Sequence, residues 1–221
     1  MGNTDLHRVR IKICGITRPE DAISAARAGA DAIGMVFHAA SPRAVDAEQA
    51  ACIVQSLPPL VTCVGVFVDP DPDQVHAVLR RVPLELLQFH GLEAPEFCSS
   101  FDRRYIKAVR MQPGIDILGM ERKHAAAAAL LLDSHAPDRA GGTGREFDWD
   151  LIPSGLRKPV ILAGGLTAAN VGAAIRRVNP FGVDVSGGVE AEKGRKDPAR
   201  MSAFVAAVAE AGMRGFTSTA R

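Results

Sequence analysis

Cys14 ends the apolar segment IKIC and is followed at once by Gly15. A thiol there could fill a core, form a disulfide, bind a metal or act as a working thiol. The other cysteines are Cys52, Cys63 and Cys98, and none forms a C-x-x-C pair or a Cys/His cluster with zinc-finger spacing. This spacing disfavours the disulfide and the metal site, and it leaves packing or chemistry for Cys14.

Asp133 ends a second apolar segment, LLLD. We expect its carboxyl group to be partly desolvated, with a pKa above the usual value of about 3.9. An aspartate that merely starts a turn is the alternative. The segment GGTG, residues 141–144, follows closely and is typical of a mobile loop that closes over a ligand.

Two glycine pairs, Gly164–Gly165 in LAGGL and Gly187–Gly188 in VSGGVE, follow the last two apolar segments. Glycine lets a backbone approach an anion closely, and the N–H groups at a helix start point at such an anion. We expect a helix after the first pair, with Thr167 as its N-cap, and a short helical turn after the second. Tight turns without a ligand are the alternative for either pair alone. No lysine follows as in a nucleotide P-loop.

Arg43 follows Pro42 in the segment SPRAV. Proline stiffens the loop, and the planar guanidinium offers a fork for a carboxylate or a phosphate. A solvated surface arginine is the alternative.

The elements that must position these residues alternate between strands and helices, which predicts βαβ units and a parallel sheet. Eight near-continuous apolar strands favour a closed (β/α)₈ TIM barrel, and we expect one such domain over residues 1–221. Helices should be shortened or missing after the fifth and sixth strands, where the chain is glycine-rich. The eight expected strands are residues 9–16, 31–37, 60–68, 84–91, 105–111, 129–134, 159–165 and 182–188.

In such a barrel the active site lies where strands end, and phosphate binds after strands 7 and 8. The two glycine pairs occupy these two places, which favours a phosphate site over plain turns. The strand-end rule selects Cys14, residues 37–43, Val68, Asp69, His90, Arg110, Asp133, Gly164, Gly165 and residues 186–188.

The composition sets limits on partners. Lys plus Arg number 26 and Asp plus Glu 25, so the net charge of +1 argues against a general nucleic-acid binder. No apolar run approaches the ~18 residues of a membrane span, and residues 1–10 carry no apolar signal region. We expect a cytoplasmic protein with no membrane partner, as a monomer or a homodimer.

The motifs KICGIT, SPRAV, GVFV, LQFHG, LLLDS, GGTG, FDW, LAGGL and GVDVSGGVE, in this order, resemble phosphoribosylanthranilate isomerase, a barrel of tryptophan biosynthesis. The resemblance runs from about Lys12 to Lys196. It implies an Amadori rearrangement of N-(5-phosphoribosyl)anthranilate, a small-molecule phosphosugar, without cofactor or metal.

The resemblance also implies roles for single residues. Cys14 matches the general base, Asp133 the general acid, and Arg43 the arginine that holds the anthranilate carboxylate. His90 matches a position near the substrate, with no assigned role. The residues that match the phosphate loops are Gly164, Gly165, Ser186, Gly187 and Gly188. Gly187 departs from the family's usual SSGVE, and the lost hydroxyl should cost about 1 kcal/mol.

Ring opening needs an acid, and removal of the C2′ proton needs a base. Here the acid would be a carboxyl group and the base a thiol, although a free carboxyl group has a lower pKa than a free thiol and would ionise first. Burial raises the pKa of both groups, so something positive or hydrogen-bonding, such as Lys12, loop amides or bound substrate, must favour the thiolate.

The main alternative is an inactive barrel that binds a phosphosugar. Histidine-pathway isomerases would end the first strand in Asp rather than Cys14, and indole-glycerol-phosphate synthase would need strand-end lysines.

Overall fold

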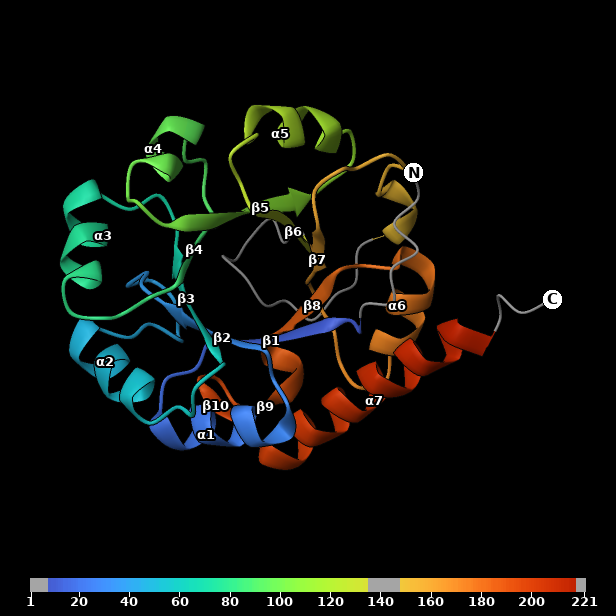
Figure 1. Cartoon of the computed structure of the whole chain (residues 1–221), viewed down its shortest axis with the longest axis horizontal. Coiled ribbons are helices and arrows are strands. Elements are labelled where there is room, and N and C mark those ends of the chain that lie inside the picture. Colours follow the sequence, from blue (N-terminus) through green and yellow to red (C-terminus); the bar gives the residue numbers. More distant parts are fainter. Residues whose placement is uncertain (1–7, 135–147, 218–221) are drawn as a thin grey trace.

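Eight parallel strands close into a barrel in chain order, and β8 pairs with β1 (Figure 1). The computed structural model describes residues 8–134 and 148–217, with residues 213–217 described by their backbone alone. The closed barrel expected from the sequence is confirmed. The strands are β1 Arg10–Cys14, β2 Ala32–Val36, β3 Thr62–Phe67, β4 Leu86–Phe89, β5 Arg104–Met111, β6 Ala129–Ser134, β7 Val160–Leu162 and β8 Gly182–Val185.

Local sequence signals set the helix ends. Proline occupies the first turn of α1, α3 and α4, where its missing N–H costs no hydrogen bond. The Asp46 side chain caps α2, and Gly29 ends α1 with a φ of 103°, which favours glycine. The helices are α1 Pro19–Ala28, α2 Ala47–Gln55, α3 Pro72–Leu79, α4 Pro95–Ser99, α5 Ile117–Lys123, α6 Val171–Val178 and α7 Pro198–Thr217.

The helix after β5 is short, as expected, since α5 has 7 residues. The described part of the segment between β6 and β7 holds one 3₁₀ turn, η1 Trp149–Leu151, and residues 141–144 of the GGTG motif lie outside the described residues. The prediction of Thr167 as an N-cap is wrong. α6 begins only at Val171, because the Asn170 side chain binds back to Gly165 O and accepts from Thr167 N and so keeps this stretch in a loop.

A small antiparallel hairpin after β8 was not predicted. It consists of β9 Glu190–Glu192 and β10 Arg195–Lys196, and it follows the 3₁₀ turn η2 Gly187–Val189. Its strands are too short to leave a period-two pattern in the sequence. The hairpin places Glu190 and Lys196 beside the end of β8, where both contact the site.

Part of the barrel interior is filled by a small apolar cluster. Because side chains alternate across a strand, every second residue of β5, β6 and β7 points inward. These residues form a small buried cluster of Ile106, Ala108, Ala129, Leu131, Ile161 and Ala163.

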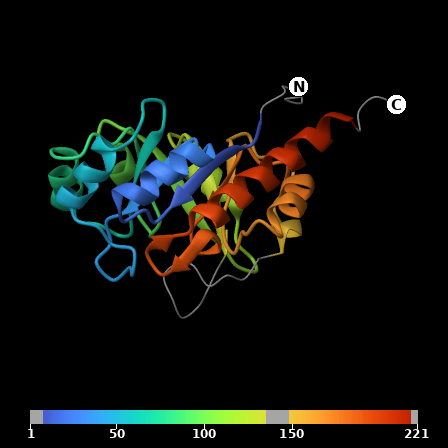
Figure 2. The same ribbon diagram turned by 90° about the horizontal axis from the view of Figure 1, so that it is seen from below.

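The last helix closes the outer ring. α7 contacts both α1 and α6, so the end of the described chain covers the junction of β8 and β1 (Figure 1 and Figure 2). Among the described residues, no helix is both long and apolar enough to cross a membrane.

Candidate active site

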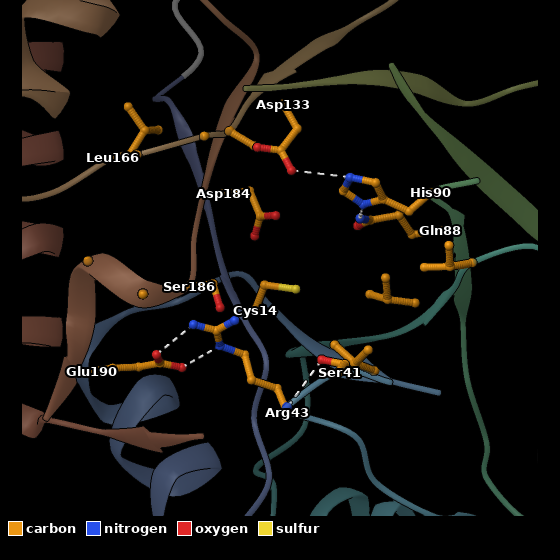
Figure 3. A pocket seen from close by; sticks show the side chains of 18 of the residues that line it. Cys14, Ser41, Arg43, Gln88, His90, Asp133, Leu166, Asp184, Ser186 and Glu190 are labelled. Atoms are coloured by element: carbon orange, nitrogen blue, oxygen red, sulfur yellow. Dashed lines mark hydrogen bonds and ion pairs between the residues drawn. The ribbon is translucent and has the colours of Figure 1, made fainter. Parts of the chain in front are cut away.

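A cavity of about 460 Å³ lies at the carboxyl ends of the barrel strands (Figure 3). The structure places every residue predicted for catalysis or binding in its lining: Cys14, Arg43, His90, Asp133, Gly164, Gly165, Ser186, Gly187 and Gly188. His38, Val68 and Arg110 line it as well.

Five residues selected by the strand-end rule do not line the cavity: Phe37, Ala39, Ala40, Pro42 and Asp69. Phe37 stacks on Phe67 in the core, with ring centroids 5.2 Å apart. The carboxylate of Asp69 accepts a hydrogen bond from Leu92 N at 2.6 Å and so braces the β4–α4 loop. A strand-end position alone therefore did not separate lining residues from bracing ones.

Cys14 is buried, and its sulfur points into the cavity (Figure 3). The N–H groups of Gly15 and Ile16 both donate to Gly34 O at 2.9 Å, which turns the chain directly after the cysteine. Gly34 leaves space for the thiol, since a Cβ atom there would lie 2.8 Å from Cys14 Sγ. Cys14 is therefore held in a fitted position at the inner wall.

A buried ion pair lies next to this thiol. Lys12 Nζ and Asp184 Oδ1 are 2.9 Å apart, and both side chains are almost fully buried. Neither atom makes an aligned hydrogen bond among the described residues, so charge holds the pair and Lys12 keeps N–H groups to offer Cys14. Burial lowers the pKa of Lys12, but the charges of Asp184 and Cys14 outweigh it and leave the pKa raised.

The same charges act on the thiol in opposite directions. Burial raises the pKa of Cys14, and the charge of Asp184 raises it further. Lys12, and more weakly Lys196, lower it without cancelling the burial, so the net pKa stays above the ordinary thiol value. These surroundings therefore favour the neutral thiol of Cys14 and place the charged Lys12 beside it.

Asp133 reaches the cavity from β6 and meets His90 from the end of β4. His90 Nε2 lies 3.1 Å from Asp133 Oδ2. On its other side the ring contacts Gln88, whose Nε2 lies 3.0 Å from His90 Nδ1 (Figure 3). The carboxyl group is thus fixed at one oxygen and faces the cavity.

Arg43 pairs with an acidic side chain from the hairpin after β8. Its Nε and one terminal nitrogen bind both carboxylate oxygens of Glu190, at 2.6 and 2.7 Å. Lys196 Nζ lies 2.9 Å from the same carboxylate. Burial raises the pKa of Glu190, but the hydrogen bond from Arg43 and the charge of Lys196 hold it below its usual value. This ionised anchor leaves the remaining N–H groups of Arg43 for a ligand.

The loops after β7 and β8 need glycine for two reasons, backbone conformation and close packing. Gly164 and Gly165 have φ values of 83° and 65°, which side chains rarely adopt. A Cβ atom on Gly188 would lie 2.0 Å from Leu166 O, so the two loops approach each other at this point. Gly187 and Gly188 begin the turn η2, where the first N–H groups have no acceptor within the turn. Such N–H groups are suited to bind an anion.

Sequence reasoning missed Gln88, Asp184 and Glu190, and raised Lys12 only as one candidate for stabilising the thiolate. Gln88 and Asp184 stand two positions before His90 and Ser186, so they share the inward face of the strand with a predicted site residue. Lys12 has the same relation to Cys14. A polar residue two places before a strand-end residue was therefore a usable signal. Glu190 carried none, because its partner Arg43 is 147 positions away.

The arrangement can do acid–base chemistry on an anionic ligand. A thiol beside a lysine lies on β1, a hydrogen-bonded carboxyl group on β6, and anion-binding loops follow β7 and β8. Among the described residues, no three His, Cys, Asp or Glu side chains gather as a metal site.

Comparisons with known proteins point in the same direction. The sequence profile of N-(5′-phosphoribosyl)anthranilate isomerase matches residues 11–207. The isomerase of that name from Pseudomonas putida strain F1 is 55% identical over 206 residues, which cover 93% of this chain and 100% of the relative. The one from Pseudomonas aeruginosa strain PAO1 is 58% identical over 200 residues, covering 90% and 95%.

Solved structures agree in fold. The crystal structure of phosphoribosyl anthranilate isomerase from Thermotoga maritima matches with a TM-score of 0.85 and 40% identity, covering 91% of this chain and 99% of that one. A second isomerase structure contains reduced 1-(o-carboxyphenylamino)-1-deoxyribulose 5-phosphate. It matches with a TM-score of 0.81 and 39% identity over 91% and 99% of the two chains.

Proposed function

The chain belongs to the N-(5′-phosphoribosyl)anthranilate isomerase family, and on that premise we propose which of its side chains carry the reaction. The family's reaction is an Amadori rearrangement, in which an aminoaldose phosphate becomes the aminoketose 1-(2-carboxyphenylamino)-1-deoxyribulose 5-phosphate. Both substrate and product carry a phosphate and a carboxylate. The cavity offers an anion-binding loop pair and an arginine that suit these two groups.

In the proposal, Asp133 is the general acid and Cys14 the general base. The carboxyl group gives its proton to the furanose ring oxygen, the bond from that oxygen to C1′ breaks, and an iminium ion forms. The thiolate form of Cys14 then takes the C2′ proton and becomes the thiol, and the C–H electron pair neutralises the iminium as an enolamine. Conversion to the ketone returns a proton to C1′ and releases one from the C2′ hydroxyl, so no proton is gained or lost overall.

Lys12 is the group that stabilises the Cys14 thiolate in this proposal. It is the largest influence that lowers the pKa of Cys14, and its partner Asp184 keeps it charged despite burial. No loop amide is among the main influences on the pKa of Cys14. The buried ion pair therefore supplies a fixed positive charge where the thiolate forms.

Substrate binding divides between two ends of the cavity. The proposal places the phosphate at Gly164, Gly165, Ser186, Gly187 and Gly188, at the start of η2 and the loop after β7. It places the anthranilate carboxylate on the N–H groups of Arg43 that Glu190 leaves free. Glu190 then acts as an anchor that fixes the direction of the guanidinium before substrate arrives.

One observation carries the proposal: the thiol and the carboxyl group reach the same cavity from β1 and β6, with the glycine loops between them in the ring of strands. The test follows the fluorescence loss of phosphoribosylanthranilate. We expect Asp133→Asn to lower kcat by about 10²- to 10⁴-fold with little change in KM.

Asp69→Asn, the same change at a strand end outside the cavity, is the matched control and should keep normal kinetics. Near-normal turnover of Asp133→Asn would remove Asp133 as the acid. Binding of the phosphosugar by the unmodified protein without any turnover would instead favour an inactive binding barrel.

We also propose a cytoplasmic location and a monomer or a homodimer. Four free cysteines, as found in this chain, are typical of a reducing compartment. A related Thermotoga maritima isomerase is described as dimeric, and its structure is that of monomers generated from the dimer. Size-exclusion chromatography with light scattering distinguishes the two assembly states.

A further inference from the structure

A hydrogen-bonded chain of three side chains leads from the barrel interior to the proposed acid. It runs from Gln88 Nε2 to His90 Nδ1 over 3.0 Å and from His90 Nε2 to Asp133 Oδ2 over 3.1 Å (Figure 3). Gln88 is 1% exposed and Asp133 is 9% exposed, while the His90 side chain between them is 18% exposed at the cavity wall. His90 is held in place by its own backbone, which donates to Phe67 O at 2.8 Å.

The direction of these bonds fixes the position of the histidine proton. An amide nitrogen has hydrogens and no accepting lone pair, so Gln88 Nε2 can only donate and His90 Nδ1 must accept. A neutral imidazole that accepts at Nδ1 carries its proton on Nε2. That proton points at Asp133 Oδ2, so His90 donates to the carboxyl group.

The packing around Gln88 supports this direction. Among the described residues, its Oε1 is buried and has no partner. A half-turn of the amide would bring Oε1 to the ring and place both N–H donors of Nε2 at that unpartnered position. Orphaned buried N–H groups are rarer than under-satisfied carbonyl oxygens. The present orientation leaves the less costly atom without a bond.

Resting on the function proposed above, we propose that Gln88 and His90 are positioning residues that direct the acid proton of Asp133. Because Oδ2 accepts from His90, the proton of the acid form is confined to Oδ1, the oxygen free to face the substrate. When the Oδ1–H bond breaks and the proton passes to the ring oxygen, the carboxylate keeps its bond from Nε2–H. His90 itself neither gains nor loses a proton.

The test reads the histidine proton directly. Nitrogen-15 spectra of histidine-labelled protein at about pH 8, above the ordinary histidine pKa of about 6.5, report which ring nitrogen carries hydrogen. We expect His90 as the Nε2–H tautomer, assigned by the signal that disappears in His90→Asn. Gln88→Met should release Nδ1 and give a mixture of tautomers, with kcat lowered roughly tenfold to a hundredfold and KM nearly unchanged.

A second variant keeps the shape of Gln88 and reverses its hydrogen bond. In Gln88→Glu a carboxylate oxygen replaces the amide nitrogen, so it must accept and should place a proton on Nδ1. Gln74→Met is the matched control, because Gln74 Nε2 donates to Phe37 O at 2.9 Å outside this chain of bonds. It should change neither the tautomer nor kcat.

Some outcomes would overturn the inference. An Nδ1–H tautomer in the unmodified protein would mean that the bonds run in the opposite direction. A tautomer that stays unchanged in both Gln88 variants would remove Gln88 from the chain, and a changed tautomer with unchanged kcat would remove its role in catalysis. If the proposed function were wrong, the unmodified protein would lack isomerase activity. The nitrogen-15 spectra would still report the tautomer of His90.

Discussion

At the scale of single residues, the surroundings of Cys14 explain how a thiol could act as the proposed base while a carboxyl group acts as the proposed acid. Burial and Asp184 raise its pKa, and Lys12 opposes both. The resting thiol is therefore neutral, and the ammonium group beside it lowers the cost of ionisation during the reaction. The balance can be measured, because Lys12 is the largest influence that favours the thiolate.

The first prediction concerns the reaction of Cys14 with iodoacetamide in a Cys52→Ala background, which removes the one exposed cysteine. Only the thiolate reacts, so the rate should reach half its maximum above the ordinary thiol range of about pH 8.5. Lys12→Met should move this midpoint to still higher pH, because burial and Asp184 are then opposed only by the weaker influence of Lys196. Mass spectrometry of the modified peptide gives the rate.

The other thiols should not interfere. Burial raises the pKa of Cys63 and of Cys98 to about 12. Lys193→Met, the same change at a cavity residue outside the influences on Cys14, is the control and should leave the midpoint in place. An unmoved midpoint in Lys12→Met would contradict the assigned role of Lys12.

At the scale of elements, the turn after β8 has space for a side chain at Gly187 but none at the next residue, Gly188. A Cβ atom on Gly187 would meet Arg43 Nη2 at 3.5 Å, an ordinary contact. Gly187→Ser should therefore fold normally and offer a hydroxyl to the phosphate, lowering KM up to about fivefold, or about 1 kcal/mol. Steady-state kinetics measure this change.

Gly188→Ser is the contrasting variant. Its Cβ atom would collide with Leu166 O, so it should lose both affinity and stability. A KM for Gly187→Ser that is unchanged or higher would mean that the phosphate does not reach this turn.

The element α5 carries a second prediction, on stability. His124 ends this helix, is 1% exposed, and has no hydrogen-bond partner for either ring nitrogen among the described residues. Burial, assisted by the charges of Lys107 and Lys123, lowers its pKa to about 4. As pH falls below about 6.5 the unfolded chain takes up the proton first, so stability is lost progressively down to about pH 4.

The size of this loss should be about 3 kcal/mol at most. Urea unfolding of the wild type and of His124→Phe at a series of pH values isolates the His124 contribution as the difference between the two curves. His76→Phe, at an exposed histidine, should leave the curve parallel to that of the wild type. Parallel curves for His124→Phe as well would contradict the buried neutral histidine.

A strand or helix can be predicted from the sequence when it is long enough to show a regular spacing of apolar residues. The strands and the first four helices were readable because apolar periodicity, proline starts and aspartate caps all agree locally. The start of α6 was missed because Asn170 holds the preceding loop through its side chain, a tertiary choice that propensity does not contain. The hairpin β9–β10 was missed because its two strands are too short to show a pattern.

At the scale of the whole molecule, the site depends on contacts between distant parts of the chain. Lys12 pairs with Asp184 across the β1–β8 seam, and Arg43 pairs with Glu190. The ends of the strands could be predicted from the sequence, and with them most of the cavity lining. The ion pairs could not be predicted, because a single sequence does not show which charged residues far apart in the chain will lie in contact.

The barrel also explains how the proposed acid and the proposed base can coexist in one cavity. β1 and β6 lie far apart in the ring of eight strands, so Cys14 and Asp133 approach the ligand from different walls. Each has its own neighbours, Lys12 and Asp184 for the thiol and His90 and Gln88 for the carboxyl group. The closed sheet thus keeps two environments separate within one cavity.

The most direct test of the account compares binding and turnover in one Cys14→Ala preparation. Titration calorimetry with reduced 1-(o-carboxyphenylamino)-1-deoxyribulose 5-phosphate, the compound bound in a related structure, measures the intact cavity. We predict a Kd within about threefold of the wild type and a turnover rate lower by about 10³-fold or more. Turnover near the wild-type rate, or a loss of binding in step with the loss of turnover, would contradict the assignment of Cys14 as the base.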